Sequence, residues 1–477
     1  MRTEEPLSSS LQRDKTEKLP RSSSRLQAKA KEPPKILRSQ NRPFEESLAT
    51  STWQRVESEV PLTEPEFVKN KDRVFKQSKR PATPSLPKHM IYRANAAECV
   101  KQSCPDPMTI FLIMYQPTLR EITIEMSNLF SIQTKARQLN MGMDELLTFY
   151  GILLASVYST VPRRHMHWSS DTDVHNLCIS NAMRRNRFDE IMASTHFVDN
   201  TKITEDPFFK VRPIFTELNK SYKVMPYPEC LSVDKSMTGY CRRNGCKQFM
   251  KGKPIRFGYK IWSLASSSGY MHHMEPYGVR QGPSVVLGLA EQGEVPPGFK
   301  FYHDNLFTSL SLLDEMTKRG CGSCGMMREN QLFDVPFKPK SEFMKLHRGT
   351  SEILMQTEKL LVHWKDNNVL TTAPCTGEQY TETVVKRWNK ERHDFNQVHQ
   401  SQCIKQYYEH MGGVDLRDQQ VSRYSITIRS KKWWWPMFSW SLSFSLCFTF
   451  DAHLIIILHV LSTVYPVSCN YYAAYHI

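Results

Sequence analysis

The sequence is short of acidic residues, and it lacks segments typical of secreted or repeat proteins. Asp and Glu number 48 against 63 Lys and Arg, which leaves a formal net charge of +15. That surplus favours a polyanionic partner, either nucleic acid or an acidic membrane surface, although a soluble basic protein without such a partner has the same composition. The N-terminus, MRTEEPLSSSLQRDK, contains no apolar core of a signal peptide, so we do not expect secretion. No internal repeat is evident.

Cysteine pairs at the spacing of a zinc site are also scarce. In a chain that is not secreted, we expect the 12 cysteines to be mostly reduced thiols. A structural zinc site needs a second pair beside Cys321 and Cys324, and the spacing of Cys241 and Cys246 is loose for that role. Buried thiols are therefore the preferred interpretation.

Only one long apolar segment is present. The run from Met437 to Leu461 is long enough to span a bilayer. Asp451 and His453 lie in its middle, where charge is costly in lipid, and serines and threonines dilute its first half. We therefore favour a buried helix of a soluble domain and expect no membrane partner.

The composition otherwise predicts a folded chain, since 40% of its residues are hydrophobic. Residues 1–104 are the exception, because Ser, Pro, Lys and Glu without an apolar period are typical of a disordered basic arm. Within this arm, KQSKRP at Lys76–Pro81 is a weak candidate for a nuclear import signal. From residue 105 to 230, apolar residues recur at helical spacing. The interleaved Arg184, Arg185 and Arg187 are either solvated charges or DNA contacts.

From residue 231 the pattern alternates between strands and helices, which predicts an α/β core. The segment RFGYKIWSLASSSGYMHHMEPYG is typical of two strands around a Ser-Ser-Gly turn, and FKFYHDN is typical of a strand that ends in an acid. LFTSLSLLDEMTKRG predicts an amphipathic helix that closes at Gly320. The less regular stretch that follows contains a predicted hairpin around Asp366–Asn368.

Four aspartates stand where an α/β sheet would bring them together. Asp234 and Asp304 each end a predicted strand, and Asp415 and Asp418 open a predicted helix after a Gly-Gly pair. Ligands collect at the carboxyl ends of strands in such sheets. Clustered carboxylates repel one another unless a cation such as Mg²⁺ neutralises them, and two such ions can support phosphodiester transfer. For any single Asp, a helix cap or a strand end is the simpler explanation.

Several sequence segments resemble those of the piggyBac transposase family and its transposable-element-derived members. The most specific are GKPIRFGYK, DNLFTS and GGVDLRDQ, and SVDKSMTGYCRRNGCKQFM and VPRRHMHW accompany them in the family's order. The resemblance implies an RNase H-like catalytic core at 231–345, interrupted by an insertion at 346–400 and completed by a last helix at 401–424. It also implies a flanking, mostly helical DNA-binding and dimerisation domain at 105–230 and 425–461, followed by a divergent tail at 462–477.

The resemblance further implies a catalytic centre. It assigns Asp234, Asp304 and Asp415 to two metal ions, Mg²⁺ with Mn²⁺ as the alternative, and makes Asp418 a nearby fourth catalytic acid. Family members cut transposon ends and join them at TTAA targets, so a nuclear, homodimeric protein that binds double-stranded DNA is expected. The alternatives are a domesticated DNA-binding nuclear protein without transposition and a decaying copy of an element.

Two basic groups acquire a predicted role in contacting DNA phosphates. The first follows Asp234 along the chain and consists of Arg242, Arg243, Lys247, Lys251, Lys253 and Arg256. In the second, Arg429, Lys431 and Lys432 accompany Trp433, whose indole is suited to stack on a base. Each basic residue taken singly is as readily a solvated surface charge.

The chain departs from the family pattern at two positions that matter for this prediction. Lys235 follows the first Asp where an acid is usual, and a cation so close is expected to perturb metal affinity. The tail retains only Cys469 and His476, whereas many members carry a cysteine- and histidine-rich zinc module there to recognise transposon ends. We therefore expect no bound zinc and impaired recognition of transposon ends.

Overall fold

The computed structural model describes residues 73, 75–77 and 106–464, apart from 253–254, 279–280, 333–334, 357–358, 376–380 and 390–391. The side chains of Lys76, Gln77, Cys375 and residues 450–464 are also not described. All described residues fall within one compact unit, Thr63–Ile477. Lys253, most of the expected arm 1–104 and the tail beyond Val464 lie outside the described residues, so the predictions made for them stay predictions.

The described chain is helical from Pro107 to Tyr222, as its apolar spacing predicted. The elements are α2 (Pro107–Met114), α3 (Pro117–Lys135), α4 (Met143–Ala155), the 3-10 turn η2 (Arg164–Trp168), α5 (Leu177–Ala182), α6 (Arg185–Ser194) and α7 (Arg212–Tyr222). Asp106 starts α2 by accepting hydrogen bonds from the amides of Met108 and Thr109, at 2.9 and 3.1 Å. Pro107 follows at the first position of the helix, where a missing N–H costs nothing.

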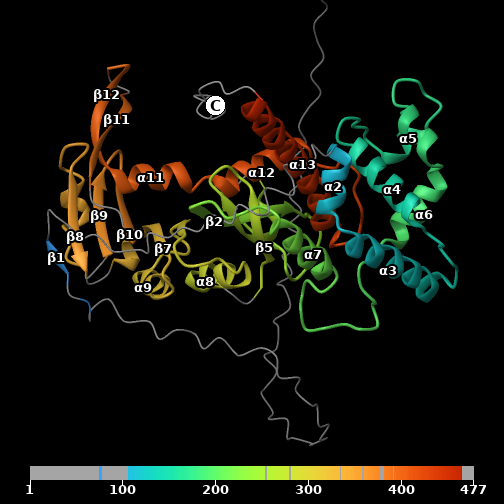
Figure 1. Cartoon of the computed structure of the whole chain (residues 1–477), viewed down its shortest axis with the longest axis horizontal. Helices are drawn as coiled ribbons and strands as arrows, with labels where there is room; N and C mark the ends of the chain where they lie inside the picture. Colours follow the sequence, from blue (N-terminus) through green and yellow to red (C-terminus); the bar gives the residue numbers. More distant parts are fainter. Residues whose placement is uncertain are drawn as a thin grey trace, which may run out of the picture. The chain divides into compact units, whose positions relative to one another are not determined.

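The long apolar run near the C-terminus forms a helix that returns to these N-terminal helices. This helix, α13 (Trp435–Val464), lies beside α2 (Figure 1), and the Tyr115 and Ser441 hydroxyls meet at 2.7 Å. Apolar residues in its first half, including Met437, Phe438 and Leu442, are buried in the core that it shares with α2, α4 and α7. Among the described residues, no helix has the length and apolar character needed to cross a membrane.

The centre of the fold is a mixed sheet with the order β5-β4-β2-β6-β7. Its strands are β2 (Cys230–Gly239), β4 (Phe257–Ser266), β5 (Met271–Pro276), β6 (Lys300–His303) and β7 (Gly322–Met327). Strands β2, β6 and β7 run parallel, whereas β4 is antiparallel to both β2 and β5. This arrangement confirms the RNase H-like core. A short strand, β3 (Gln248–Phe249), pairs with the start of β4.

Helices cover both faces of this sheet (Figure 1). On one face, α8 (Pro283–Gln292) and α9 (Leu310–Lys318) pack against the odd-numbered residues of β2, among them Leu231 and Val233. On the other face, α11 (Gln402–His410) and α12 (Gly413–Arg423) lie over the even-numbered residues, where Ser232 donates a hydrogen bond to the Met411 carbonyl. The alternation of side chains along β2 therefore assigns its residues to two different environments.

Part of the expected insertion at 346–400 continues the central sheet. Strand β10 (Val369–Cys375) pairs with β7, and β9 (Lys359–Lys365) and β8 (Ser351–Gln356) follow outwards. The reason is that the outer edge of β7 carries backbone donors and acceptors that β10 satisfies. The β9–β10 hairpin closes around Asp366–Asn368 as predicted. Strands β11 (Glu382–Asn389) and β12 (Asp394–Ser401) form a separate hairpin that projects from the sheet (Figure 1), while α10 (Lys340–Phe343) and η3 (Glu329–Gln331) lie between β7 and β8 in sequence.

The prediction of a wholly disordered arm at 1–104 is corrected at a few residues. Lys76–Gln77 form strand β1, which pairs with Met355 and Leu354 of β8. Arg73 anchors this segment through an ion pair with Asp314, 2.6 Å between Nη2 and Oδ2. The first two residues of the candidate import signal are thus part of the sheet edge, and the rest of that signal lies outside the described residues.

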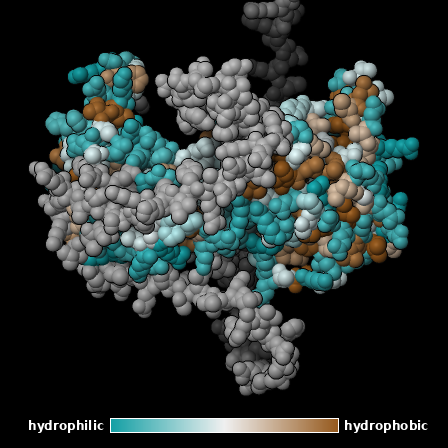
Figure 2. All heavy atoms as spheres, viewed as in Figure 1, coloured by the Kyte–Doolittle hydropathy of each residue, from teal (hydrophilic) through white to brown (hydrophobic). Residues whose placement is uncertain are grey.

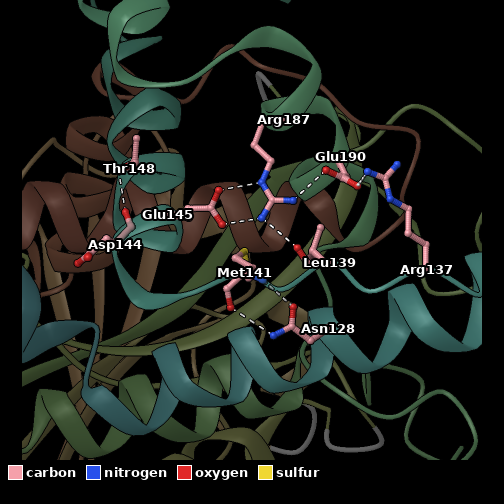
Figure 3. Close-up of polar contacts among 9 residues, drawn as sticks. All are labelled: Asn128, Arg137, Leu139, Met141, Asp144, Glu145, Thr148, Arg187 and Glu190. Carbon is pink, nitrogen blue, oxygen red and sulfur yellow. Dashed lines mark hydrogen bonds and ion pairs between the residues drawn. The ribbon is translucent and has the colours of Figure 1, made fainter.

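One of the three interleaved arginines of the helical part has a structural role. Arg187 donates to both carboxylate oxygens of Glu145, to Glu190 and to the Leu139 carbonyl, at 2.6–2.9 Å (Figure 3). It therefore ties α6 to α4 and to the loop between α3 and α4. Arg184 and Arg185 are exposed and remain available for a partner.

Candidate active site

Asp234 and Asp304 lie on neighbouring parallel strands, and only one of them ends its strand. Asp304 directly follows β6, as predicted. Asp234 lies in the middle of β2, because Lys235 to Gly239 continue to pair with β4, so its prediction as a strand end is corrected. The parallel register places Val233 opposite His303, which brings the two following aspartates to the same place on the sheet.

The turn after β6 fixes the position of Asp304. The buried imidazole of His303 contacts the Thr308 and Ser323 hydroxyls at 2.9 and 2.7 Å, and burial lowers its pKa to about 4. The Asn305 amide donates to the Asp304 carboxylate at 2.6 Å, and the Phe307 amide donates to its carbonyl. The DNLFTS segment is therefore a built turn that presents one carboxylate at the end of the strand.

Helix α12 brings the remaining two acids to the same face of the sheet. Gly413 packs directly on the backbone of β4, since a Cβ at this position would overlap the Ser266 carbonyl. Arg417 is 1% exposed, and its Nε donates to the Gly269 carbonyl at 2.6 Å, in the turn between β4 and β5. Sequence reasoning missed Arg417, although it lies inside the GGVDLRDQ segment. An arginine between two acids of a predicted helix was the available signal.

The electrostatics of the site couple the four aspartates, although their exposure ranges from the buried Asp234 to the exposed Asp415. Burial raises the pKa of Asp234, and the charges of Asp415 and Asp304 add to this effect while Lys235 opposes it. Burial also raises the pKa of Asp418 to about 7, with Asp415 and Asp234 adding to the shift and the Ser236 hydroxyl opposing it. Oδ1 of Asp418 is shielded from solvent without a hydrogen-bond partner. The structure thus brings together the acids that lie far apart in the sequence.

Lys235 places a cation inside this acidic cluster. Its Nζ lies 3.2 Å from Oδ1 of Asp234 and 3.5 Å from Oδ2 of Asp304. Burial acts to lower the pKa of Lys235, but the charges of Asp234 and Asp304 outweigh that effect and raise it. Across the part of the chain that the structure describes, no three His, Cys, Asp or Glu side chains are arranged to hold a metal ion. In this arrangement the residues therefore do not fit a divalent ion, because an ammonium group holds two of the expected ligands.

The first predicted basic group forms a surface hairpin next to the site. It spans the end of β2, β3 and the start of β4, and Gly252 turns it at a φ of 81°. Among its described residues, Arg242, Arg243, Lys251 and Arg256 are exposed, and Lys247 lies 5.1 Å from the centre of the Phe257 ring. Lys253 lies outside the described residues. The hairpin is therefore both basic and aromatic on its exposed side.

The second predicted basic group is divided by the structure. Arg429 and Lys431 are exposed. The Lys432 ammonium instead donates to the Met192 and Thr195 carbonyls at 3.0 and 2.9 Å, where it caps the end of α6. The Trp433 ring packs edge-on against Phe208 and Tyr259. We therefore correct the prediction and remove Lys432 and Trp433 from the DNA-contacting set, because their polar and aromatic groups are engaged within the fold.

The four cysteines considered for a zinc site differ in their exposure to solvent. Cys321 and Cys324 are buried, whereas Cys241 is exposed and Cys246 is half-buried. None of these four described cysteines forms a disulfide bond. The burial of Cys321 and Cys324 agrees with the prediction of buried thiols, and the expectation of no bound zinc stays a prediction.

Comparison with known proteins agrees with this architecture. The family profile described as Transposase IS4 matches residues 106–447, which is more than two thirds of the chain. The chain belongs to the piggyBac-type transposase family. Within this family, it is similar to the human PiggyBac transposable element-derived protein 3, with 35% identity over 353 residues that cover 69% of this chain and 59% of the relative. It is also similar to the human PiggyBac transposable element-derived protein 2, with 31% identity over 357 residues that cover 71% and 60% of the two chains.

A solved structure of a piggyBac transposase in a synaptic complex with hairpin DNA shares the fold. The match has a TM-score of 0.62 and 20% identity, and it covers 76% of this chain and 77% of that one. The piggyBac-type chain described here spans about three fifths of the length of the two human relatives.

Proposed function

We propose that the chain binds double-stranded DNA and that Asp234, Asp304 and Asp415 are the acids of a centre for DNA strand cleavage and transfer at TTAA targets. Asp418 is the nearby fourth acid of this centre. The observation that carries the proposal is the convergence of these acids on one place of an RNase H-like sheet. The DNA in the solved synaptic complex of a piggyBac transposase supports the class of substrate.

The basic hairpin is the proposed DNA contact nearest to the acids. Four of its exposed residues are Lys or Arg, and the exposed rings of Phe249 and Phe257 lie among them. Contacts of this kind give binding that weakens steeply with salt, because DNA releases condensed counterions when cations neutralise its phosphates. The rings provide apolar surface that a duplex end or an unstacked base can cover.

The Lys235 ammonium has to move away from Asp234 and Asp304 before these two acids are available to a metal ion. Transposases of this type generally use divalent metal ions. Mg²⁺, with Mn²⁺ as the alternative, is therefore the ion to supply when cleavage is tested. A second candidate function, DNA binding without strand cleavage, is favoured by the ion pairs that Lys235 forms with Asp234 and Asp304.

A cleavage assay separates the two candidates. The purified full chain is incubated with Mg²⁺ or Mn²⁺ and with duplexes that carry transposon ends flanked by TTAA, and nicks and hairpins are resolved on denaturing gels. We expect products with the wild type and none with Asp304→Asn. Equal activity of Asp304→Asn, or no product from the wild type, would refute the cleavage part of the proposal.

DNA binding is tested independently of cleavage. We expect Arg242→Ala/Arg243→Ala to weaken binding and to reduce the salt slope by about 1.8, from roughly 0.9 for each lost phosphate contact. The matched control is Lys318→Ala/Arg319→Ala, which removes two neighbouring positive charges at the end of α9. If both double variants bind DNA like the wild type, the basic hairpin does not contact DNA.

We also propose a nuclear, homodimeric protein, as expected for a DNA-bound transposase. Hydrophobic residues gather over the helical part in Figure 2, and α2 and α3 expose the apolar side chains of Met108, Ile113 and Ile132. Such a surface is suited to a second copy of the chain. Light scattering of the purified chain that gives a monomer mass at micromolar concentration would argue against the dimer, and a cytoplasmic fluorescent fusion would argue against the location.

A further inference from the structure

The ammonium group of Lys235 bridges carboxylates from two strands of the central sheet. It contacts Asp234 on β2 and Asp304 after β6, at 3.2 and 3.5 Å. The side chains of Lys235 and Asp234 are 10% and 7% exposed, whereas that of Asp304 is 31% exposed. The side chains of Lys235 and Asp234 are therefore largely shielded from water, whereas Asp304 is open to solvent.

This contact is not dictated by the backbone position of Lys235. Successive side chains of a strand start on opposite faces, so Lys235 leaves β2 on the face away from Asp234. Only its long, flexible stem allows the ammonium to reach a carboxylate of the preceding residue. A lysine withdrawn from water requires a charged partner, and clustered carboxylates require a cation. Each group thus supplies what the other lacks.

We propose that Lys235 is a resident counter-ion that occupies the place between Asp234 and Asp304 and competes there with a divalent metal ion. Metal binding then requires the ammonium to swing away, which the solvent-exposed side of Asp304 permits. The proposal deepens the proposed function, since it regards these acids as the metal centre. It concerns the affinity of the centre for metal and does not depend on whether DNA is cleaved.

The first test measures Mn²⁺ binding to the full chain without DNA, by electron paramagnetic resonance of the free ion. Lys235→Gln keeps a polar side chain of similar length and removes the competing charge. We expect it to bind Mn²⁺ more tightly than the wild type, by on the order of tenfold or more. The reason is that a positive charge at this distance from the ligands repels the incoming ion and competes for the same carboxylates. The gain should disappear in Lys235→Gln/Asp304→Asn.

Lys260→Gln is the matched control. Lys260 lies on the neighbouring strand β4 with its Nζ 5.1 Å from the centre of the Tyr277 ring, and the same charge is removed without touching the Asp234 and Asp304 contacts. We expect a much smaller gain in Mn²⁺ affinity from this variant. If Lys235→Gln and Lys260→Gln bind Mn²⁺ equally, the proposal is wrong.

A second measurement uses the wild type and does not depend on how a variant folds. Acylation of lysines is followed by mass spectrometry with and without Mn²⁺. We expect Mn²⁺ to increase the labelling of Lys235 relative to Lys260, because the ion displaces the first ammonium and leaves the second in place. Unchanged or decreased labelling of Lys235 at Mn²⁺ concentrations that saturate the chain would overturn the proposal.

The outcomes distinguish this proposal from the proposed function. Tighter Mn²⁺ binding by Lys235→Gln, together with no DNA binding or cleavage by any variant, would support the counter-ion and refute the function. Cleavage that Asp304→Asn abolishes, together with unchanged Mn²⁺ affinity in Lys235→Gln, would support the proposed function and refute the role of Lys235 as a counter-ion.

Discussion

Replacing Gly413 by alanine tests how closely α12 must approach the sheet. A Cβ on Gly413 would overlap the Ser266 carbonyl oxygen, and it would lie 3.0 Å from the carbonyl carbon and 3.3 Å from Cβ of Ser232. Ordinary van der Waals contact begins at 3.4 Å, so two strands crowd the new methyl group at once. Backbone atoms cannot rotate away as a flexible side chain does, and α12 itself must therefore move.

The control for this change is the preceding glycine. Gly412 is exposed, and a Cβ there would meet nothing within 4 Å. Its φ of −76° is also open to alanine. We expect Gly412→Ala to be neutral or slightly stabilising, whereas Gly413→Ala should lower the free energy of unfolding by about 1–3 kcal/mol, as overpacked cores do.

The consequence for the site follows from what α12 carries. Asp415 and Asp418 move with the helix, and a misplacement of about 1 Å at a catalytic centre can cost on the order of a hundredfold in rate. Urea unfolding gives the stability of each variant, and hydrogen exchange of the α12 amides reports the local loosening. The cleavage assay gives the rate. If Gly413→Ala matches Gly412→Ala in all three measurements, the close approach of α12 to β4 does not position the acids.

Two further predictions concern charges outside that contact. The pKa of Asp418 is raised to about 7 in the folded chain, against roughly 3.9 in an unfolded one, so between these values the folded state binds a proton that the unfolded state has lost. The unfolding free energy should therefore fall as pH rises through this window, by at most about 1.4 kcal/mol per pH unit. In urea titrations with EDTA at several pH values, Asp418→Asn should flatten this dependence on pH. The same dependence in both proteins would show that Asp418 does not have a raised pKa. Arg187→Ala should destabilise the helical part by about 1–3 kcal/mol, because it leaves Glu145 and Glu190 without their shared partner (Figure 3), whereas the exposed Arg185→Ala should change the melting temperature little.

The sequence allowed the prediction of Asp304 because its surroundings are local. A short apolar strand, a turn and an amphipathic helix follow one another there, and each has its own pattern. Asp234 was misplaced within its strand because the apolar run ends at Val233. The strand continues through Ser236 and Thr238, which are buried although polar, and only the pairing with β4 reveals this.

Other features depend on contacts that no local pattern records. Strand β1 has two residues, too few for an alternation, and it is held by Arg73 against Asp314 far along the chain. The second basic group, in which Lys432 is engaged within the fold and Arg429 and Lys431 are exposed, also depends on contacts between distant segments. Lys432 resembles any other member of a basic run until the fold places the end of α6 over its ammonium.

The positions of the acids and the charge that surrounds them are determined by different residues. Gly413 and Arg417 hold α12 against β4 through backbone contacts, and these fix where the acids lie. Lys235 acts afterwards, on the charge that the assembled acids present. A lysine at this position leaves the architecture of a piggyBac-type centre intact while it alters which cation the centre holds. Lys235→Gln should therefore change the charge of the centre without moving α12, whereas Gly413→Ala should displace the acids and so affect both stability and the centre.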